Sequence, residues 1–302
     1  MQFSSEQDSD LSTELYSTIR LRDGRTITYL EVGNADGFPI FHFHGHGSSR
    51  LEVRLLAEKA AEFGIRLIGI DRPGVGRSDP NRGARLMDWP DDVAAVADEL
   101  GIERFAIEGI SGGGPYALAC AYKIPHRLTA CGLVSTVVPS DLFRKAAPTW
   151  MSTMWSMAEH CPKALRFFLR LALPDSAPNV QAVERRLLRI SSWLGEPDRR
   201  LLRTSEFRTA LARAIVESRR QGARAHREEA VTELLPWGFQ IEETAFENIF
   251  LWHGEQDRVI PVGPARLLAQ ALPHCRATYY PDEGHFSVLV NHAKDISGAL
   301  RG

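Results

Sequence analysis

Gly109-Ile110-Ser111-Gly112-Gly113 is the stretch that decides the fold of this chain. It follows the apolar run Phe105-Ala106-Ile107 and precedes the small and apolar residues 114–121, an order that predicts strand, tight turn and helix. Glycines two positions before and two positions after the serine allow the strand and the helix to approach each other closely. This context predicts a sharp turn that presents the Ser111 hydroxyl above a sheet. A glycine-rich loop that merely ends a strand has the same local pattern, so the rest of the chain must distinguish the two.

The composition is typical of a globular protein. The chain has 302 residues, of which 44% are hydrophobic and 25% charged, with a net charge of −2. This balance gives no support for nucleic-acid binding. The polar, acidic N-terminus lacks the pattern of a signal peptide, and no 18-residue apolar run predicts a membrane span. The cysteines are scattered without metal-ligand spacing, which indicates reduced thiols: Cys120, Cys131, Cys161 and Cys275. We therefore expect a cytoplasmic protein with a small-molecule substrate, no metal or cofactor and no membrane or nucleic-acid partner, while the oligomeric state stays open.

Strand-like and helix-like segments alternate in the first half of the chain. Residues 15–32 are typical of a β-hairpin that turns at residues 22–25. Short apolar runs then predict buried strands, and between them the pattern predicts helices at about 52–63 and 89–100. The strand-like runs are 39–44, 66–70, 104–108 and 128–136, with two more at 248–252 and 277–280. Such alternation favours a mostly parallel sheet covered on both faces, with its ligand site at the carboxyl ends of the strands.

The alternation stops at residue 138 and resumes at residue 244. Between them only helical patterns occur, at 158–173, 180–193, 207–219 and 223–235. This block holds 17 Lys and Arg against 13 Asp and Glu, a net charge of +4, so the rest of the chain carries −6. We interpret residues 138–243 as a helical cap inserted into a core formed by residues 15–137 and 244–302, and residues 1–14 as a flexible tail.

A serine hydroxyl becomes a good nucleophile when a histidine takes its proton and a carboxylate orients that histidine. One residue of each kind follows a predicted strand downstream of Ser111. Asp257 lies in the segment after residue 252, and His285 lies in the segment after residue 280. The order Ser111, Asp257, His285 predicts a catalytic triad. Asp141, which follows the preceding strand, is an alternative for the acid.

Together, five segments resemble the α/β-hydrolase superfamily, in particular its capped serine-hydrolase branch of carboxylesterases, C–C bond hydrolases and proline-iminopeptidase-like enzymes. They are 44–47, 71–78, 109–113, 254–257 and 283–285. The resemblance implies the α/β-hydrolase fold, a mostly parallel central sheet with helices on both faces and an inserted helical cap. It also implies an oxyanion hole formed by the backbone N–H groups of His46 and Gly112. Gly114 departs from the family pattern, and Glu108 has no assigned role.

The start of the cap is rich in methionine and tryptophan. We expect Met151, Met154 or Trp155 to contact the substrate, although the same density is typical of helix packing. The expected function is hydrolysis of small or medium apolar carboxylic esters through an acyl-enzyme on Ser111. The alternatives are the same triad acting on an amide or a C–C bond, and a ligand-binding sensor without turnover. A net basic cap disfavours an aminopeptidase, whose cap should hold the substrate ammonium with acidic residues.

Overall fold

The structure is a computed structural model that describes residues 16–173, 175–176 and 178–302. The predicted tail, residues 1–14, lies outside the described residues. So do the side chains of a few residues in the cap: Met154, Met157, Ala158 and Pro162.

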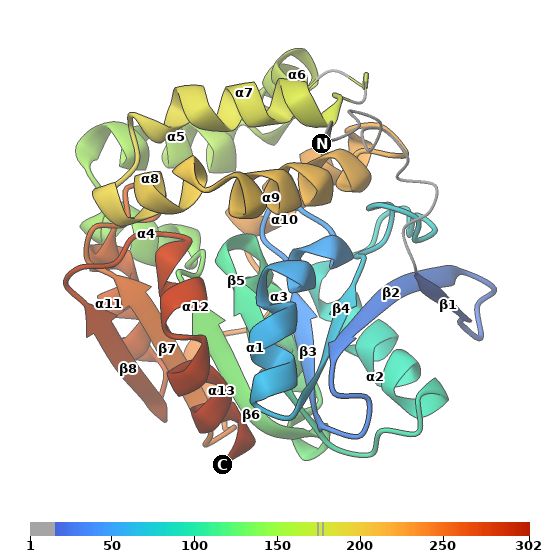
Figure 1. Cartoon of the computed structure of the whole chain (residues 1–302). Helices are drawn as coiled ribbons and strands as arrows, with labels where there is room; N and C mark the ends of the chain where they lie inside the picture. The colour runs from blue at the N-terminus through green and yellow to red at the C-terminus, as the bar shows by residue number, and fades with distance from the viewer. Residues whose placement is uncertain (1–15, 174, 177) are drawn as a thin grey trace.

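One eight-stranded sheet organises the chain, in the order β1-β2-β4-β3-β5-β6-β7-β8 (Figure 1). β2 pairs antiparallel with β1 and with β4, and all pairings from β4 to β8 are parallel. The strands are β1 (Ser17–Arg20), β2 (Thr26–Gly33), β3 (Phe38–Phe43), β4 (Ile65–Ile70), β5 (Phe105–Ile110), β6 (Leu128–Val134), β7 (Ile249–Gly254) and β8 (Cys275–Tyr280). The predicted mostly parallel sheet is thereby confirmed.

Helices cover both faces of the sheet because its strands are apolar on both sides. β5 shows this alternation: Phe105 and Ile107 pack into the larger core cluster, and Ala106 and Ile110 into the smaller one on the other face. The larger cluster includes side chains of α2 (Trp89–Glu99), α3 (Gly114–Lys123) and α11 (Val262–Ala271). The smaller one includes side chains of the 3₁₀ turn Arg50–Leu56, α1 (Ala57–Glu62), α12 (Ser287–Asn291) and α13 (Ala293–Arg301). The predicted helix at 52–63 is thus a 3₁₀ turn followed by a short α-helix.

The segment between β6 and β7 is helical and lies across the end of the sheet at which the parallel strands finish (Figure 1). Its helices are α4 (Ser140–Ala146), α5 (Thr149–His160), α6 (Pro162–Ala172), α7 (Val180–Ser191), α8 (Glu196–Arg203), α9 (Ser205–Ser218) and α10 (Arg224–Leu234). α7, α8 and α9 share a hydrophobic cluster of their own, whereas Leu142 and Phe143 of α4 pack into the larger core cluster. α6 starts at Pro162, where a proline is tolerated because the first helical N–H has no intrahelical partner.

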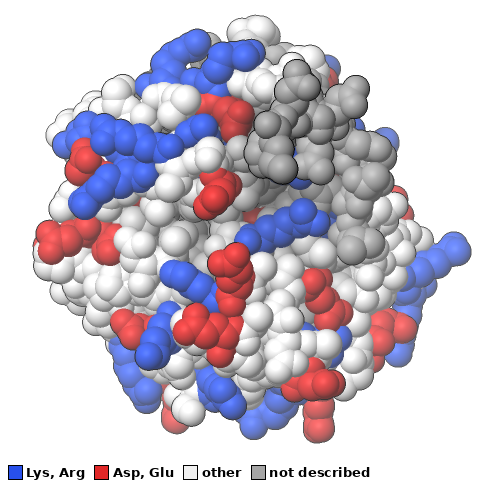
Figure 2. Space-filling view, in the orientation of Figure 1, with Lys and Arg blue, Asp and Glu red and all other residues white. Residues whose placement is uncertain are grey.

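Charged side chains of both signs are spread over the surface (Figure 2). Basic side chains gather over the part of the face in Figure 2 where Figure 1 places α7 and α8. Within the described residues, no helix is both long and apolar enough to cross a membrane.

Candidate active site

Ser111 sits at the sharp turn that the sequence predicts. β5 ends at Ile110, a single 3₁₀ turn covers Ser111–Gly113, and α3 begins at Gly114. Ser111 has a φ of 52°, a left-handed conformation that costs a non-glycine residue about 1–3 kcal/mol. A Cβ on Gly109 would clash with the carbonyl group of Gly113, and a Cβ on Gly113 would clash with that of Phe43. The two glycines therefore allow the close approach that holds the strained serine in place.

The imidazole of His285 is hydrogen-bonded to a carboxylate. Its Nδ1 lies 2.8 Å from Oδ2 of Asp257, and both side chains are buried. Asp257 Oδ1 accepts the backbone N–H groups of Val259 and Ile260 at 2.8 and 2.9 Å, which fixes the carboxylate at the end of β7. With Asp257 ionised, Nδ1 of His285 carries the proton and Nε2 is left free to accept one. The other candidate acid, Asp141, lies on α4, is exposed and forms an ion pair with Lys145 at 3.3 Å.

A carboxylate from the cap holds the loop that carries His285. Asp198 on α8 is fully buried and accepts the backbone N–H groups of His285, Phe286 and Ser287 at 2.7, 2.8 and 3.1 Å. A side chain at Gly284 would clash with that carboxylate. The sequence does not reveal this role of Asp198, because nothing in its neighbourhood on α8 indicates a partner 87 residues away.

The surroundings of His285 predict the pH dependence of any reaction in which it acts as base. Burial by itself lowers the pKa of His285, but attraction to Asp257 and the hydrogen bond between them outweigh burial and raise the pKa above 6.5. The protonated imidazolium cannot accept a proton, so kcat/KM should fall at low pH and rise with a midpoint above 6.5.

A pH–rate profile from pH 5 to 9 checks this expectation, with circular dichroism at each pH as the control for folding. Burial lowers the pKa of His44 to about 3, so it stays neutral over this range. Neighbouring glutamates outweigh burial and raise the pKa of His42 and of the cavity-lining His46 to about 9, so these two titrate at the upper end of the range. A flat profile between pH 5 and 8 would contradict His285 as the base.

Ser111 and His285 line the same cavity, of about 250 Å³. Its remaining walls are mostly apolar and come from the 3₁₀ turn after β3, from α7 and α9, and from the segments around residues 259 and 286–290. The apolar lining residues are Leu55, Ile110, Leu187, Phe207, Leu211, Ile215, Val259, Phe286, Leu289 and Val290. These apolar walls suit an apolar ligand group.

The residues expected to contact the substrate lie elsewhere. Met151 and Trp155 pack against the larger core cluster, and Trp155 stacks on Phe143 with ring centroids 3.9 Å apart. Neither lines the Ser111 cavity, so their contact with the substrate stays a prediction that this cavity does not support. The face of α5 that carries them packs onto α4, and helical spacing alone does not reveal that choice. The Met154 side chain lies outside the described residues.

The two expected oxyanion donors lie side by side. A Cβ placed on Gly112 would be 3.0 Å from the backbone nitrogen of His46. The segment before His46 is held by Arg72, whose guanidinium donates to the carbonyl oxygens of His44 at 2.6 Å and Gly45 at 3.4 Å. Two glutamates of the cap complete this arrangement. Glu229 forms an ion pair with Arg72 at 2.6 Å, and Glu233 lies 3.2 Å from Nδ1 of His46.

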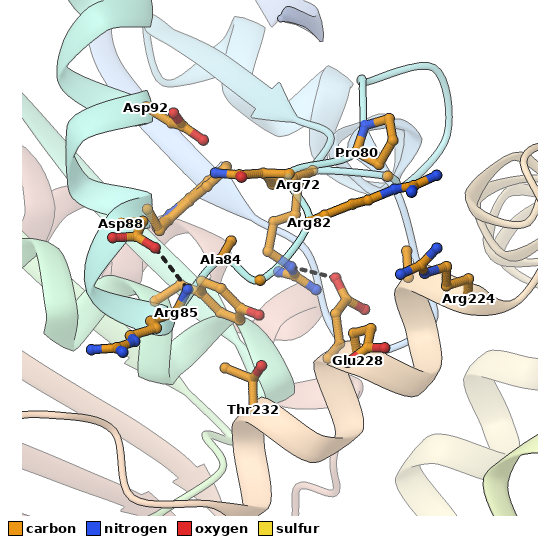
Figure 3. Close-up of a pocket in the computed structure, with 18 of the residues that line it drawn as sticks. Arg72, Pro80, Arg82, Ala84, Arg85, Asp88, Asp92, Arg224, Glu228 and Thr232 are labelled. Carbon is orange, nitrogen blue, oxygen red and sulfur yellow. Dashed lines mark hydrogen bonds and ion pairs between the residues drawn. The ribbon is translucent and has the colours of Figure 1, made fainter. Parts of the chain in front are cut away.

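Arg72 also lines a second cavity, of about 400 Å³, which lies between residues 72–92 and α10. Figure 3 shows the Arg72 side chain reaching from the segment after β4 towards the helix that carries Glu228 and Thr232. Exposed arginines rim this cavity, among them Arg82 and Arg224. Its lining does not include Ser111 or His285, and both of these residues line the smaller, more apolar cavity.

Gly114 and Glu108, the two departures noted in the sequence, have structural explanations. A side chain at Gly114 would clash with Thr136, so this glycine lets α3 pack against the segment after β6. Glu108 lies 2.7 Å from Nδ1 of His42, whose Nε2 lies 3.1 Å from Glu52. Within the described part of the chain, no group of three or more His, Cys, Asp or Glu is arranged to hold a metal ion.

Comparison with protein families gives a match to the α/β hydrolase fold over residues 39–292. A non-heme chloroperoxidase from Streptomyces lividans is 35% identical over 124 residues, which is 40% of this chain and 45% of that protein. A 2-hydroxymuconate semialdehyde hydrolase from Pseudomonas putida is 24% identical over 272 residues, which is 86% of this chain and 84% of that protein. The chain thus spans about half the length of some curated relatives and most of the length of others.

Solved structures with the same fold include an esterase and a lactone-degrading enzyme. The esterase RhEst1 from Rhodococcus sp. ECU1013 is 21% identical, with a TM-score of 0.64 over 94% of this chain and 96% of that one. Est816, described as an N-acyl homoserine lactone degrading enzyme, is 22% identical, with a TM-score of 0.65 over 95% of this chain and 99% of that one. At these identities the likeness concerns the fold alone.

Proposed function

Because this chain belongs to the α/β-hydrolase family, we propose that it is a serine hydrolase that cleaves small or medium apolar carboxylic esters through an acyl-enzyme on Ser111. One observation carries the proposal: Ser111 and His285 line one apolar cavity, and His285 is bound to the buried Asp257. Relatives named as hydrolases and an esterase of the same fold support the reaction class.

The first half of the proposed reaction forms the acyl-enzyme. Nε2 of His285 takes the proton of Ser111 as its oxygen attacks the ester carbonyl carbon. Asp257 stays ionised and stabilises the imidazolium that results. The negative charge on the former carbonyl oxygen is held by the backbone N–H groups of His46 and Gly112. The C–O bond to the alcohol then breaks, and His285 gives its proton to the leaving alcohol.

Water completes the cycle. His285 removes a proton from a water molecule, whose oxygen attacks the acyl carbon and passes through a second oxyanion at the same N–H groups. The bond to Ser111 breaks and the serine recovers its proton from His285. Arg72 donates a hydrogen bond to the carbonyl oxygen of His44, and Glu52 accepts one from the N–H of Gly45. These two hydrogen bonds keep the oxyanion donors in place before substrate arrives.

The structure bears on one rival function. The net basic charge of the cap disfavours an aminopeptidase, yet α10 places the buried Glu229 and Glu233 next to His46. Both are already engaged, Glu229 by Arg72 and Glu233 by His46. Their charge is thereby balanced within the protein, and ester hydrolysis remains the function we propose.

An activity screen tests the proposal. A fluorophosphonate probe should label Ser111, which mass spectrometry of the digested protein identifies. A panel of neutral esters, lactones, aminoacyl anilides and a vinylogous 1,5-diketone should then give the highest kcat/KM among the esters. A higher value for the diketone would favour C–C bond cleavage, and one for the anilides would favour an aminopeptidase. Tight binding of a panel member without product release would favour a sensor.

The size of the cavity predicts a chain-length dependence. Each CH₂ of the acyl group that enters the apolar cavity should contribute about 0.8 kcal/mol, or roughly a fourfold increase in kcat/KM. The increase should stop, and then reverse, once the cavity is filled. A series of 4-nitrophenyl esters from acetate upwards measures this dependence.

Two neighbouring leucines provide a matched test of that dependence. Leu187 lines the cavity, so Leu187→Ala should move the optimum towards longer acyl chains. Leu188, on the same helix but exposed, is the control, and Leu188→Ala should leave the optimum unchanged. If neither variant changes the acyl chain length with the highest kcat/KM, this cavity is not the acyl site.

A further inference from the structure

A buried histidine lies between two carboxylates beneath the candidate active site. His42 on β3 is fully buried, and Glu108 lies opposite it on the neighbouring strand β5. Nδ1 of His42 is 2.7 Å from Glu108, and Nε2 is 3.1 Å from Glu52. Both ring nitrogens can donate to carboxylates only if the imidazole is protonated. Burial lowers the pKa of His42, but the hydrogen bonds to Glu108 and Glu52 outweigh burial and raise it to about 9.

This cluster places one more carboxylate than cation in the protein interior. Buried ions are costly unless they are paired and hydrogen-bonded, and one histidinium between two carboxylates leaves one negative charge uncompensated within the cluster. Glu108 is buried in the sheet, where its carboxylate is hydrogen-bonded to His42, and it forms the inner end of this cluster. Glu52 is at the outer end, where its carboxylate reaches the cavity of Ser111.

Glu52 is close to the nucleophile. Its two carboxylate oxygens share the backbone N–H of Gly45, each at 3.3 Å. A Cβ placed on Gly45 would lie 3.6 Å from Cβ of Ser111 and 3.8 Å from Oε2 of Glu52, so both side chains lie next to Gly45. Among the described residues that line the cavity, Glu52 is the acidic one, and most of the others are apolar.

One oxygen of Glu52 keeps the capacity to accept a further hydrogen bond. Oε1 already faces His42 and Gly45, Oε2 shares the N–H of Gly45, and the hydroxyl of Ser48 on the cavity wall is a further donor to the carboxylate. These three donors leave one of the about four acceptor positions of the carboxylate open. A carboxylate oxygen accepts about two hydrogen bonds, and a charged acceptor in an apolar cavity binds a donor strongly. His42 holds the carboxylate in place, so it cannot turn away to find a partner elsewhere.

We propose that Glu52 is a specificity-determining residue of the Ser111 cavity, which makes the site prefer esters that carry a hydroxyl or ammonium group on the carbon next to the carbonyl. This inference rests on the ester hydrolysis proposed above. A purely alkyl substituent at that carbon leaves the remaining acceptor position of the buried carboxylate unfilled, whereas a donor of the same size fills it. Sites of this kind discriminate between such pairs far more strongly than an apolar pocket does.

Three ethyl esters that differ in one group test the proposal. Ethyl isobutyrate, ethyl lactate and alanine ethyl ester carry a methyl, a hydroxyl or an ammonium group at the same position. Their kcat/KM values are measured by acid release at pH 7 for the wild type and for Glu52→Gln, which removes the charge and keeps the shape. Each result is the lactate or alaninate value divided by the isobutyrate value, and comparing these ratios between enzymes cancels the intrinsic reactivity of the esters.

Both ratios should fall in Glu52→Gln, the alaninate ratio by at least about tenfold, since opposite charges in a partly desolvated site attract strongly. The lactate ratio should fall less, because a glutamine oxygen still accepts a hydrogen bond. The control is Glu58→Gln, which removes the same charge from an exposed position on α1 and should leave both ratios unchanged. A loss of kcat/KM by one common factor for all three esters would overturn the proposal and leave Glu52 as an anchor for Gly45.

A second variant covers the case in which Glu52→Gln does not fold, as judged by its thermal unfolding. Glu108→Gln weakens the hold on His42 and leaves the cavity carboxylate in place, and both ratios should fall in the same direction by a smaller factor. Unchanged ratios in a folded Glu108→Gln would then overturn the proposal. Failure of the proposed function has a different signature, since the wild type would then hydrolyse none of the three esters.

Discussion

Ser111→Ala is expected to abolish ester hydrolysis and fluorophosphonate labelling in a protein that still folds. The variant removes the oxygen that would attack the carbonyl, and losing the nucleophile of a serine triad lowers kcat by about a millionfold. A low residual rate from the oxyanion donors and from binding should remain. Alanine and serine meet the same strain at a φ of 52°, so the free energy of unfolding should change little. Activity assays, probe labelling and thermal unfolding measure these three effects.

Ser135 provides a matched control. It is buried whereas Ser111 is half-buried, has a φ of 45° and follows the neighbouring strand β6, and it does not line the Ser111 cavity. Ser135→Ala therefore repeats the chemical change in a similar backbone conformation away from the proposed nucleophile, and it should keep activity and labelling. Near wild-type turnover in Ser111→Ala would disprove the assignment of the nucleophile.

Local patterns in the sequence predicted the framework of the site. Gly109 and Gly113 bracket Ser111, and their spacing alone indicates a turn in which strand and helix nearly touch. The alternation of strands and helices likewise predicts a parallel sheet, whose carboxyl ends collect the loops that carry Asp257 and His285. These features depend on neighbours in the chain, so one sequence suffices to find them.

The partners of the site depend on contacts between distant segments, and the sequence does not encode them locally. Glu52 and Glu108 lie 56 positions apart and meet through His42, and no local pattern around His42 indicates such a role. The pairing of His42 with Glu108 follows from the register between β3 and β5, which no short pattern reveals. Asp198 reaches the loop of His285 from the cap in the same way.

The cavity walls show why residue type is a weak guide to substrate contact. A helix rich in tryptophan and methionine has the same pattern whether its apolar face meets a ligand or another helix. Trp155 stacks on Phe143 of α4, whereas Leu187 and Phe207, on helices without such an aromatic pattern, line the cavity of Ser111. The choice depends on how α5 and α7 dock onto the core, which is decided by tertiary packing.

Asp257→Asn is expected to lower kcat by up to about ten thousandfold, whereas Asp141→Asn should have little effect. The amide keeps the shape of the side chain but removes the negative charge that stabilises the imidazolium. An amide N–H₂ group that faces Nδ1 of His285 also favours the wrong tautomer of the imidazole. Asp141 is exposed and paired with Lys145, so its loss removes the same charge from the surface.

Comparing the two variants at one pH above the midpoint of the wild-type profile separates the two candidate acids. The pKa of His285 should also fall in Asp257→Asn, because the attraction to the carboxylate no longer outweighs the effect of burial. The acid limb of the profile should therefore move to lower pH. That shift is the decisive part of the measurement, since a merely misfolded variant loses activity without moving its profile. A larger loss in Asp141→Asn would transfer the role of the acid to the segment after β6, and an unmoved profile in a folded Asp257→Asn would remove Asp257 from the triad.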